Sequence, residues 1–140
     1  MTTPPLEQHD APRAGAARTT LVPGLLAGVA AAVVNSVIYA IAAAAGVSPA
    51  AAVGADPIEV LPSMPAVASF VPLAIAAVVA WLIVRAAPGA RRVLAWIGFA
   101  VGILSALVPL FAGVDLGSSL SLAAMHVVTG VAWLVALVRR

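Results

Sequence analysis

The chain has 140 residues, of which 64% are hydrophobic and 9% charged, and its mean hydropathy is +1.16. Soluble domains carry about 25% charged residues, so this composition excludes a soluble globular protein and predicts one embedded in a membrane. The sequence pI is near 10.5, yet the net charge is only +2, so we expect no nucleic-acid partner. Cysteine is absent, which excludes disulfides and thiol chemistry.

A polar segment with three prolines, residues 1–20, opens the chain. It buries too little apolar surface to offset its conformational entropy, so we expect a disordered tail. Four apolar runs follow, each long enough as a helix to cross about 30 Å of hydrocarbon. None contains a charged residue; they occupy residues 21–45, 65–84, 93–111 and 120–138.

The connections between these runs carry turn signals. The first, residues 46–64, is rich in glycine and proline around the alternating Ile58, Glu59 and Val60. This alternation predicts a short strand or a turn over the mouth of the bundle, although the nearby prolines disfavour a stable sheet. Pro88 after the second run predicts a tight turn between antiparallel neighbours.

Two prolines fall inside the predicted spans. Pro72 lies within the second span, where we expect a kink that leaves the Ala68 carbonyl without its helical donor. Pro109 lies close to the outer end of the third span, where we expect it to end the helix.

All seven arginines fall on one side of the predicted membrane, before the first span, between the second and third, and at the end of the chain. Asp56, Glu59 and Asp115 fall on the other side. The positive-inside rule therefore predicts that both termini are cytoplasmic. A cleaved signal peptide is the competing interpretation of residues 21–45, but this apolar run is longer than the core of a typical signal peptide.

Small residues recur at every fourth position of the first span and again in the third. In lipid, helices associate through close packing of small residues and through interhelical hydrogen bonds. An alanine-rich chain forms such stripes by chance, so the glycines carry more weight, and we predict that the first and third spans pack together. The predicted packing residues are Gly24, Gly28, Ala32, Ser36, Gly98 and Gly102.

Each span also contributes a polar side chain, and a rise of about 1.5 Å per residue places these side chains in the outer half or near the middle of the bilayer. Buried polar groups need partners. We therefore expect them to point inward, either fastening the helices or lining a small wet cavity that accepts a ligand. The predicted members are Asn35, Tyr39, Ser69, Ser105, His126 and Thr129.

His126 is the only histidine in a span, so we expect no zinc or haem site, no other metal and no cofactor. Hydrolysis by Ser105 or Ser69 with His126 would lack a nucleophile-elbow sequence and an intramembrane acid, so we expect no enzymatic activity. The tryptophans lie toward the arginine-bearing ends, where indoles favour the headgroup interface. Trp81, Trp96 and Trp133 are thus expected to be interface anchors.

Three short pairs stand in a fixed order on the spans, Asn35 with Tyr39, Ser105 with Pro109, and Met125 with His126. With them the chain resembles a family of uncharacterised actinobacterial membrane proteins that is known only as a domain of unknown function. The similarity covers residues 21–138. The resemblance implies a four-helix membrane fold without an established activity, and it supplies neither a substrate nor catalytic residues.

Taken together, these patterns predict an all-α integral membrane protein, a four-helix bundle over residues 21–140 with antiparallel neighbours, multi-pass in the plasma membrane. The leading functional hypothesis is a non-enzymatic structural or accessory protein that contacts lipid, another membrane protein or itself through its small-residue faces. The alternative is a small carrier or receptor with an outer-half pocket for a small or lipophilic ligand. Proton-coupled antiport of the small multidrug transporter kind is not expected, because no glutamate lies in a span.

Overall fold

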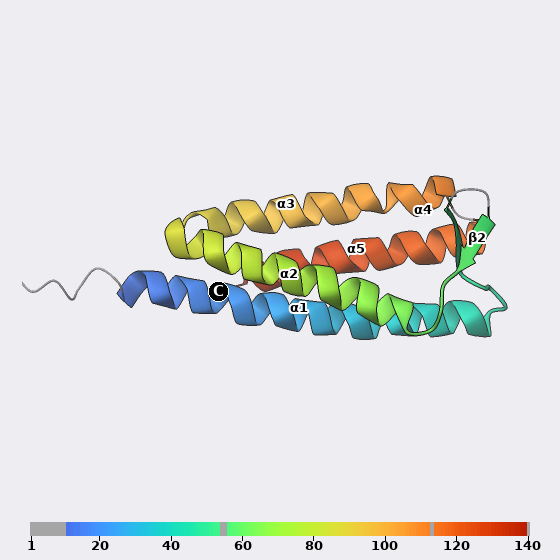
Figure 1. Ribbon diagram of the computed structural model, residues 1–140, viewed down its shortest axis with the longest axis horizontal. Coiled ribbons are helices and arrows are strands. Elements are labelled where there is room, and N and C mark those ends of the chain that lie inside the picture. The colour runs from blue at the N-terminus through green and yellow to red at the C-terminus, as the bar shows by residue number, and fades with distance from the viewer. Residues whose placement is uncertain (1–10, 54–55, 113, 140) are drawn as a thin grey trace, which may run out of the picture.

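The computed structural model describes the backbone of residues 11–53, 56–112 and 114–139, and side chains within these ranges except those of 11–19, 53 and 56. Four long helical segments form an elongated bundle with a small sheet at one end (Figure 1). In chain order the elements are α1 (Ala11–Ala44), β1 (Ala50–Val53), β2 (Asp56–Glu59), α2 (Met64–Ala86), α3 (Ala90–Ser105), α4 (Leu107–Ala112) and α5 (Leu116–Val138).

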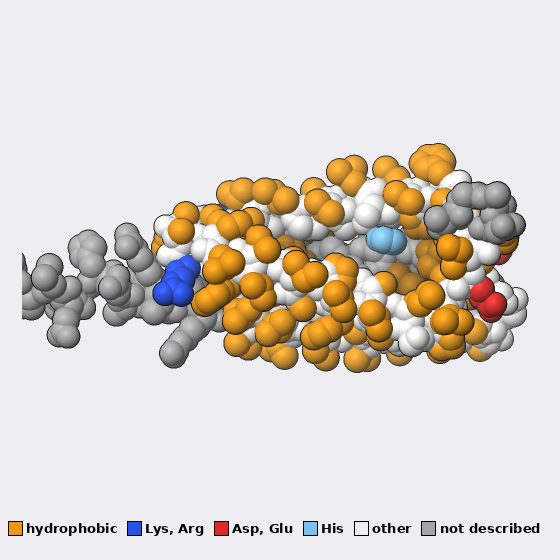
Figure 2. Space-filling model, in the orientation of Figure 1, with side chains coloured by type: hydrophobic (Ala, Val, Ile, Leu, Met, Phe, Trp, Pro, Cys, Tyr) orange, Lys and Arg blue, Asp and Glu red, His pale blue; other side chains and the backbone are white. Residues whose placement is uncertain are grey.

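Four helical segments are long and apolar enough to cross a membrane, with α3 and α4 together forming the third. They end within a few residues of the predicted spans, so the predicted four-helix membrane fold is confirmed. Most large apolar side chains lie on the outer surface of the bundle, as expected where lipid is the solvent (Figure 2). The segments are Thr20–Ala44, Met64–Ala86, Ala90–Ala112 and Leu116–Val138.

The first helix is longer than the predicted span. It begins at Ala11, so residues 11–20, which we expected in a disordered tail, are helical. Pro12 falls in the first turn, where its missing N–H removes no helical bond, and alanine and arginine, both strong helix formers, follow it. The rest of the expected tail, residues 1–10, lies outside the described residues.

The order in which the helices pack differs from the prediction. α1 packs along both α2 and α5, and α3 packs along α5, whereas α2 and α3 make few contacts. A Cβ on Gly24 of α1 would lie 2.6 Å from the Cβ of Ala77 in α2. A Cβ on Gly102 of α3 would lie 2.6 Å from the Cα of Gly130 in α5. The predicted pairing of the first and third spans is therefore wrong.

The buried face of α1 is broader than one stripe of small residues because it contacts two helices. Ala32 and Ser36, two of the predicted packing residues, are only partly buried at its margin. Gly24 and Gly28, the other two predicted packing residues of this helix, are buried. The buried residues form two rows with fourfold spacing, Thr20, Gly24 and Gly28 in one and Ala27, Ala31 and Asn35 in the other.

Trp133 belongs to the core of the bundle. Its side chain is only 4% exposed, and its Nε1 donates a hydrogen bond to the Leu94 carbonyl at 3.0 Å. The indole lies against Gly98, where a Cβ would collide with the ring. The predicted interface position of Trp133 is thus wrong, while the anchoring role of Trp81 and Trp96 stays a prediction.

α1 ends in a turn that requires glycine. Gly46 has a φ of +81°, a backbone conformation that side chains with a Cβ rarely adopt. Its N–H donates to the Ala43 carbonyl, and the Val47 N–H donates to the Ala42 carbonyl, both at 3.0 Å. This pair of bonds is a Schellman motif, which satisfies carbonyls that the helix end leaves without donors.

β1 and β2 form an antiparallel hairpin. Of the two predicted alternatives for this segment the short strand is therefore observed, and the expectation that nearby prolines disfavour a sheet is wrong. The Val60 N–H donates to the Pro49 carbonyl at 2.8 Å, which makes these two residues a hydrogen-bonded pair. Such pairs alternate along an antiparallel ladder, so Ala52 and Pro57 form a non-hydrogen-bonded pair. The nitrogen of Pro57 faces away from β1, and its missing N–H removes no ladder bond.

Pro109 interrupts the third span, whereas we expected this proline to end the helix. It cannot donate to the Ser105 carbonyl, and the helix breaks at Ala106 before it resumes as α4. Pro72, by contrast, lies inside an uninterrupted α2. Its missing N–H leaves the Ala68 carbonyl without a helical donor.

Asp115 caps the N-terminus of α5. Its Oδ1 accepts from the Ser118 N–H at 2.9 Å, and its Oδ2 accepts from the Ser118 hydroxyl at 2.7 Å. The same hydroxyl accepts a hydrogen bond from the N–H of Ala50 in β1 at 3.3 Å, which ties the hairpin to this helix. The hydrogen bond from the Ser118 hydroxyl, and to a smaller extent the one from the Ser118 N–H, hold the pKa of Asp115 below its ordinary value.

Asp115→Asn is expected to remove an acid-sensitive contribution to stability. A carboxyl pKa that is lower in the folded state stabilises the protein above the unfolded-state pKa, and this stabilisation is lost as pH falls through the folded-state pKa. Asparagine also caps helices but does not titrate. Thermal unfolding in detergent should therefore show a melting-temperature advantage of the natural protein at neutral pH that shrinks below about pH 4.

The difference between the two proteins is the quantity to compare, because all other carboxyl groups are common to both. A melting-temperature difference that stays constant from neutral to acidic pH would contradict the assignment of Asp115 as an ionised cap.

Candidate ligand-binding cavity

A cavity of about 680 Å³ lies between α2, α3 and α5, with Asn35 of α1 behind it. Small-molecule sites typically enclose about 300 to 1,000 Å³. Because α2 and α3 make few contacts, the cavity opens sideways between them. Figure 2 shows this hollow, with a histidine visible inside it, which is His126 because His9 lies outside the described residues.

Apolar side chains form most of the cavity wall. No aspartate, glutamate, lysine or arginine is among the described residues that line it. Five of the six predicted polar site residues do line it, and they are Asn35, Ser69, Ser105, His126 and Thr129.

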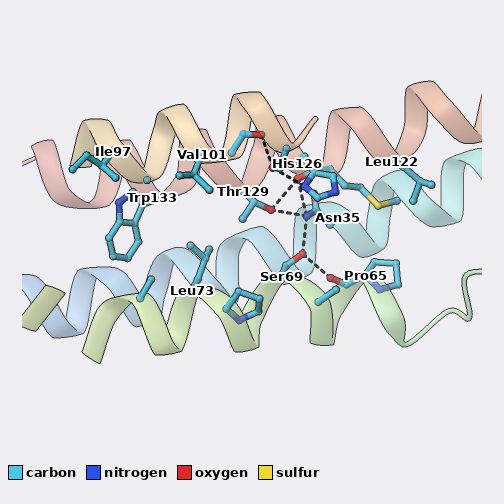
Figure 3. A pocket seen from close by; sticks show the side chains of 18 of the residues that line it. Asn35, Pro65, Ser69, Leu73, Ile97, Val101, Leu122, His126, Thr129 and Trp133 are labelled. Atoms are coloured by element: carbon cyan, nitrogen blue, oxygen red, sulfur yellow. Dashed lines mark hydrogen bonds between the residues drawn. The ribbon is translucent and has the colours of Figure 1, made fainter. Parts of the chain in front are cut away.

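Asn35 joins three helices at the back of the cavity (Figure 3). Its side chain is only 1% exposed. The amide nitrogen donates to Ser69 Oγ of α2 at 2.7 Å, and to Thr129 Oγ1 and the Met125 carbonyl of α5, both at 3.1 Å. Asn35 thus fastens α1 to α2 and to α5.

The two hydroxyls around Asn35 use their protons within their own helices. Ser69 Oγ donates to the Pro65 carbonyl at 2.6 Å, and Thr129 Oγ1 donates to the Met125 carbonyl at 2.8 Å. Each hydroxyl therefore accepts from the Asn35 amide, which fixes the direction of the network. The amide oxygen Oδ1 is buried and has no hydrogen-bond partner within the described part of the chain.

Ser105 and His126 form a separate pair on the open wall of the cavity. Ser105 Oγ lies 3.0 Å from His126 Nδ1 and 2.9 Å from the Gly102 carbonyl, to which it can donate. The histidine side chain is exposed in the hollow and Ser105 is partly buried. When Ser105 donates to Gly102, His126 Nδ1 is the donor of the pair and Nε2 remains as an acceptor.

The predicted polar layer is thus two structures, a buried fastener centred on Asn35 and an accessible pair of Ser105 with His126. Tyr39 belongs to neither, because it does not line the cavity and makes no side-chain hydrogen bond within the described residues. Sequence reasoning did not place Trp133 at the cavity. Its spacing of seven residues from His126, two helical turns on one face, is the signal that could have found it.

Among the described residues, no group of three or more histidine or acidic side chains is placed to hold a metal ion. The cavity instead offers hydrogen bonds in an apolar setting. Its polar groups lie on one part of the wall, so the site is suited to a molecule with one polar group and a larger apolar body.

Residues 15–140 match a family of unknown function, DUF6069. Comparisons with curated proteins and with solved structures gave no significant match. The matched region includes all four membrane-spanning segments and every residue that lines the cavity, and it confirms the expectation of an uncharacterised domain family. The chain therefore belongs to the DUF6069 family.

Proposed function

We propose that this protein is a non-enzymatic membrane carrier or receptor that holds a lipophilic ligand in the cavity between α2 and α3. The observation that supports this most is the sideways opening of a cavity of about 680 Å³ in a bundle surrounded by lipid. A molecule dissolved in the bilayer can enter such a cavity without crossing water. The apolar wall suits its body, and Ser105 with His126 provides contacts for its polar group.

The structural or accessory hypothesis has less support than it had from the sequence. It relied on small-residue faces being available to a partner. Gly24 and Gly28 are instead occupied by α2, while Gly98 and Gly102 are occupied by α5. These four glycines pack the helices of one chain together, so none of the four is available to another protein.

We propose no catalytic step at the Ser105 and His126 pair. A serine nucleophile needs a base that a third group orients, and no carboxylate is among the described residues of the cavity wall. A hydrolase would show an activity that disappears in Ser105→Ala.

We further propose that the protein is multi-pass in the plasma membrane with both termini in the cytoplasm. Four described arginines gather at one end of the bundle, and Glu59 and Asp115 lie at the other (Figure 2). The positive-inside rule assigns the arginine end to the cytoplasm. These arginines are Arg85, Arg91, Arg92 and Arg139.

Val101→Phe is expected to expel the ligand, and Val108→Phe is its matched control. Both valines belong to the third span and are similarly exposed, at 60% and 63%, but only Val101 lines the cavity. The added ring fills the cavity in one variant and faces lipid in the other. Native mass spectrometry of protein extracted from membranes in mild detergent should show bound apolar molecules on the natural protein and on Val108→Phe, and fewer on Val101→Phe.

The proposal fails if the natural protein carries no bound apolar molecule, or if both variants carry as much as the natural protein does. Circular dichroism of each variant checks that the helices are retained.

A further inference from the structure

The wall of the cavity changes character along the helix axis (Figure 3). His126 and Ser105 lie together at one level. From there toward the arginine end, Val101 and Ile97 line the cavity as far as Trp133. His126 and Trp133 are seven residues apart on α5, so this apolar part is about 10 Å long.

The cavity disfavours a charged occupant. A charge moved from water or the headgroup region into this part of the bilayer needs an opposite charge or several hydrogen bonds. No described side chain of the wall is acidic, and none is lysine or arginine. The polar group that lies beside His126 is therefore uncharged.

The polar groups that the wall leaves open call for a partner that can donate a hydrogen bond. A neutral imidazole has one donor and one acceptor nitrogen, and Nδ1 is already engaged with Ser105, so Nε2 is left for the ligand. Ala68 also lines the cavity, and its carbonyl lacks a helical donor because Pro72 has no N–H. A hydroxyl can donate to either of these acceptors, whereas an ester or ketone can only accept.

We infer that the occupant is an uncharged single-chain amphiphile with a hydroxyl headgroup, of the long-chain alcohol or monoacylglycerol class. Its hydroxyl lies at Ser105 and His126, and its chain follows Val101 and Ile97 to the ring of Trp133. This inference rests on the proposed function, because it names the chemistry of the molecule that the cavity holds.

Trp133 can report the occupant directly. With Trp81 and Trp96 replaced by phenylalanine, Trp133 is the sole tryptophan, and its side chain is only 4% exposed. Dodecanol, dodecanoate and dodecylammonium, each brominated at the eighth chain carbon so that the bromine reaches Trp133, are added to this protein in nanodiscs at a pH where the last two are charged. Bromine quenches tryptophan on contact, so quenching that saturates reports a chain seated against Trp133.

Brominated dodecanol should saturate the quenching at a roughly tenfold lower concentration than either charged compound, which corresponds to about 1.4 kcal/mol. His126→Phe, which keeps an aromatic ring without its nitrogens, should abolish this preference, and Ser105→Ala should weaken it. Val101→Phe should prevent saturable quenching by all three compounds, and Val108→Phe should not.

The outcomes separate this inference from the proposed function. Equal, saturable quenching by all three compounds that Val101→Phe blocks would overturn the hydroxyl assignment and leave the proposed function intact. A preference for dodecanoate or dodecylammonium would likewise overturn the hydroxyl assignment and leave the proposed function intact. Quenching that rises without saturation for every compound, unaffected by Val101→Phe, would overturn both.

Discussion

Gly102→Ala is expected to destabilise the bundle by roughly 1–3 kcal/mol, the range for inserting a methyl group where there is no room. The new Cβ would lie 2.6 Å from the Cα and 2.9 Å from the nitrogen of Gly130. These are backbone atoms and cannot move aside as a flexible side chain can. The only relief is to separate α3 from α5 along one of the main contacts of the bundle. Thermal unfolding in detergent, followed by circular dichroism, measures the loss.

Gly89→Ala is the control for this substitution. Gly89 has a φ of −69° and a ψ of −16°, which alanine adopts readily, and an added Cβ would meet nothing within 4 Å. Its stability should be unchanged or slightly raised, because alanine lowers the entropy of the unfolded chain. Equal melting temperatures for the Gly102 and Gly89 variants would show that α3 and α5 do not approach as closely as described.

Asn35→Ala is expected to lower stability by roughly 1–2 kcal/mol, since interhelical hydrogen bonds in membranes average about 0.6 kcal/mol and the two amide protons shared among three acceptors are lost. Ser69 and Thr129 keep their bonds to their own helices, so neither hydroxyl is left without a partner. The loss reports the fastening of α1 to α2 and α5. Equilibrium unfolding in mixed micelles measures it.

Ser36→Ala next to it provides the comparison. The Ser36 hydroxyl bonds only the Ala32 carbonyl of its own helix at 2.8 Å, so its removal breaks no contact between helices. Asn35→Ala and His126→Phe together separate the stabilising part of the polar layer from the ligand-binding part that we propose. Asn35→Ala should lower stability in the presence or absence of ligand, whereas the effect of His126→Phe should fall mainly on ligand binding. A stable Asn35→Ala protein would argue against the fastener.

The four spans could be predicted from the sequence because the requirement for a membrane-spanning helix, a long apolar run, is local. A helix in lipid needs about 20 apolar residues whatever its neighbours are. The pairing of the helices is not local in this sense. The row of Gly24 and Gly28 would accept any helix that brings a smooth surface, and only the whole bundle decides that α2 is that helix.

The depth of each polar residue in the bilayer was predictable, but the helix that its side chain faces was not. A fixed rise per residue places Asn35, Tyr39, Ser105 and His126 at neighbouring levels of the bilayer. It does not say which of them face one another, and Tyr39 proved to be apart from the rest. The cavity itself arises because α2 and α3 fail to pack together, and no local pattern records a missing contact.

Local rules also failed where tertiary contacts overrode them. Trp133 lies at a depth typical of interface tryptophans. Its ring is nevertheless buried, because it packs against Gly98, which has no side chain, and donates a hydrogen bond to the Leu94 carbonyl. Pro57 disfavours a sheet in general, yet the register of the hairpin turns its nitrogen away from the ladder.

The sideways opening between α2 and α3 has a consequence for the selectivity of the proposed ligand site. An apolar tail moves from one hydrocarbon medium into another when it leaves the bilayer for this groove, so burying it yields little net free energy. Every phospholipid tail competes for the same space at very high local concentration. Discrimination must then come from the few hydrogen bonds at His126 and Ser105, and the meaningful affinity is a mole fraction in the lipid, not a molarity in water.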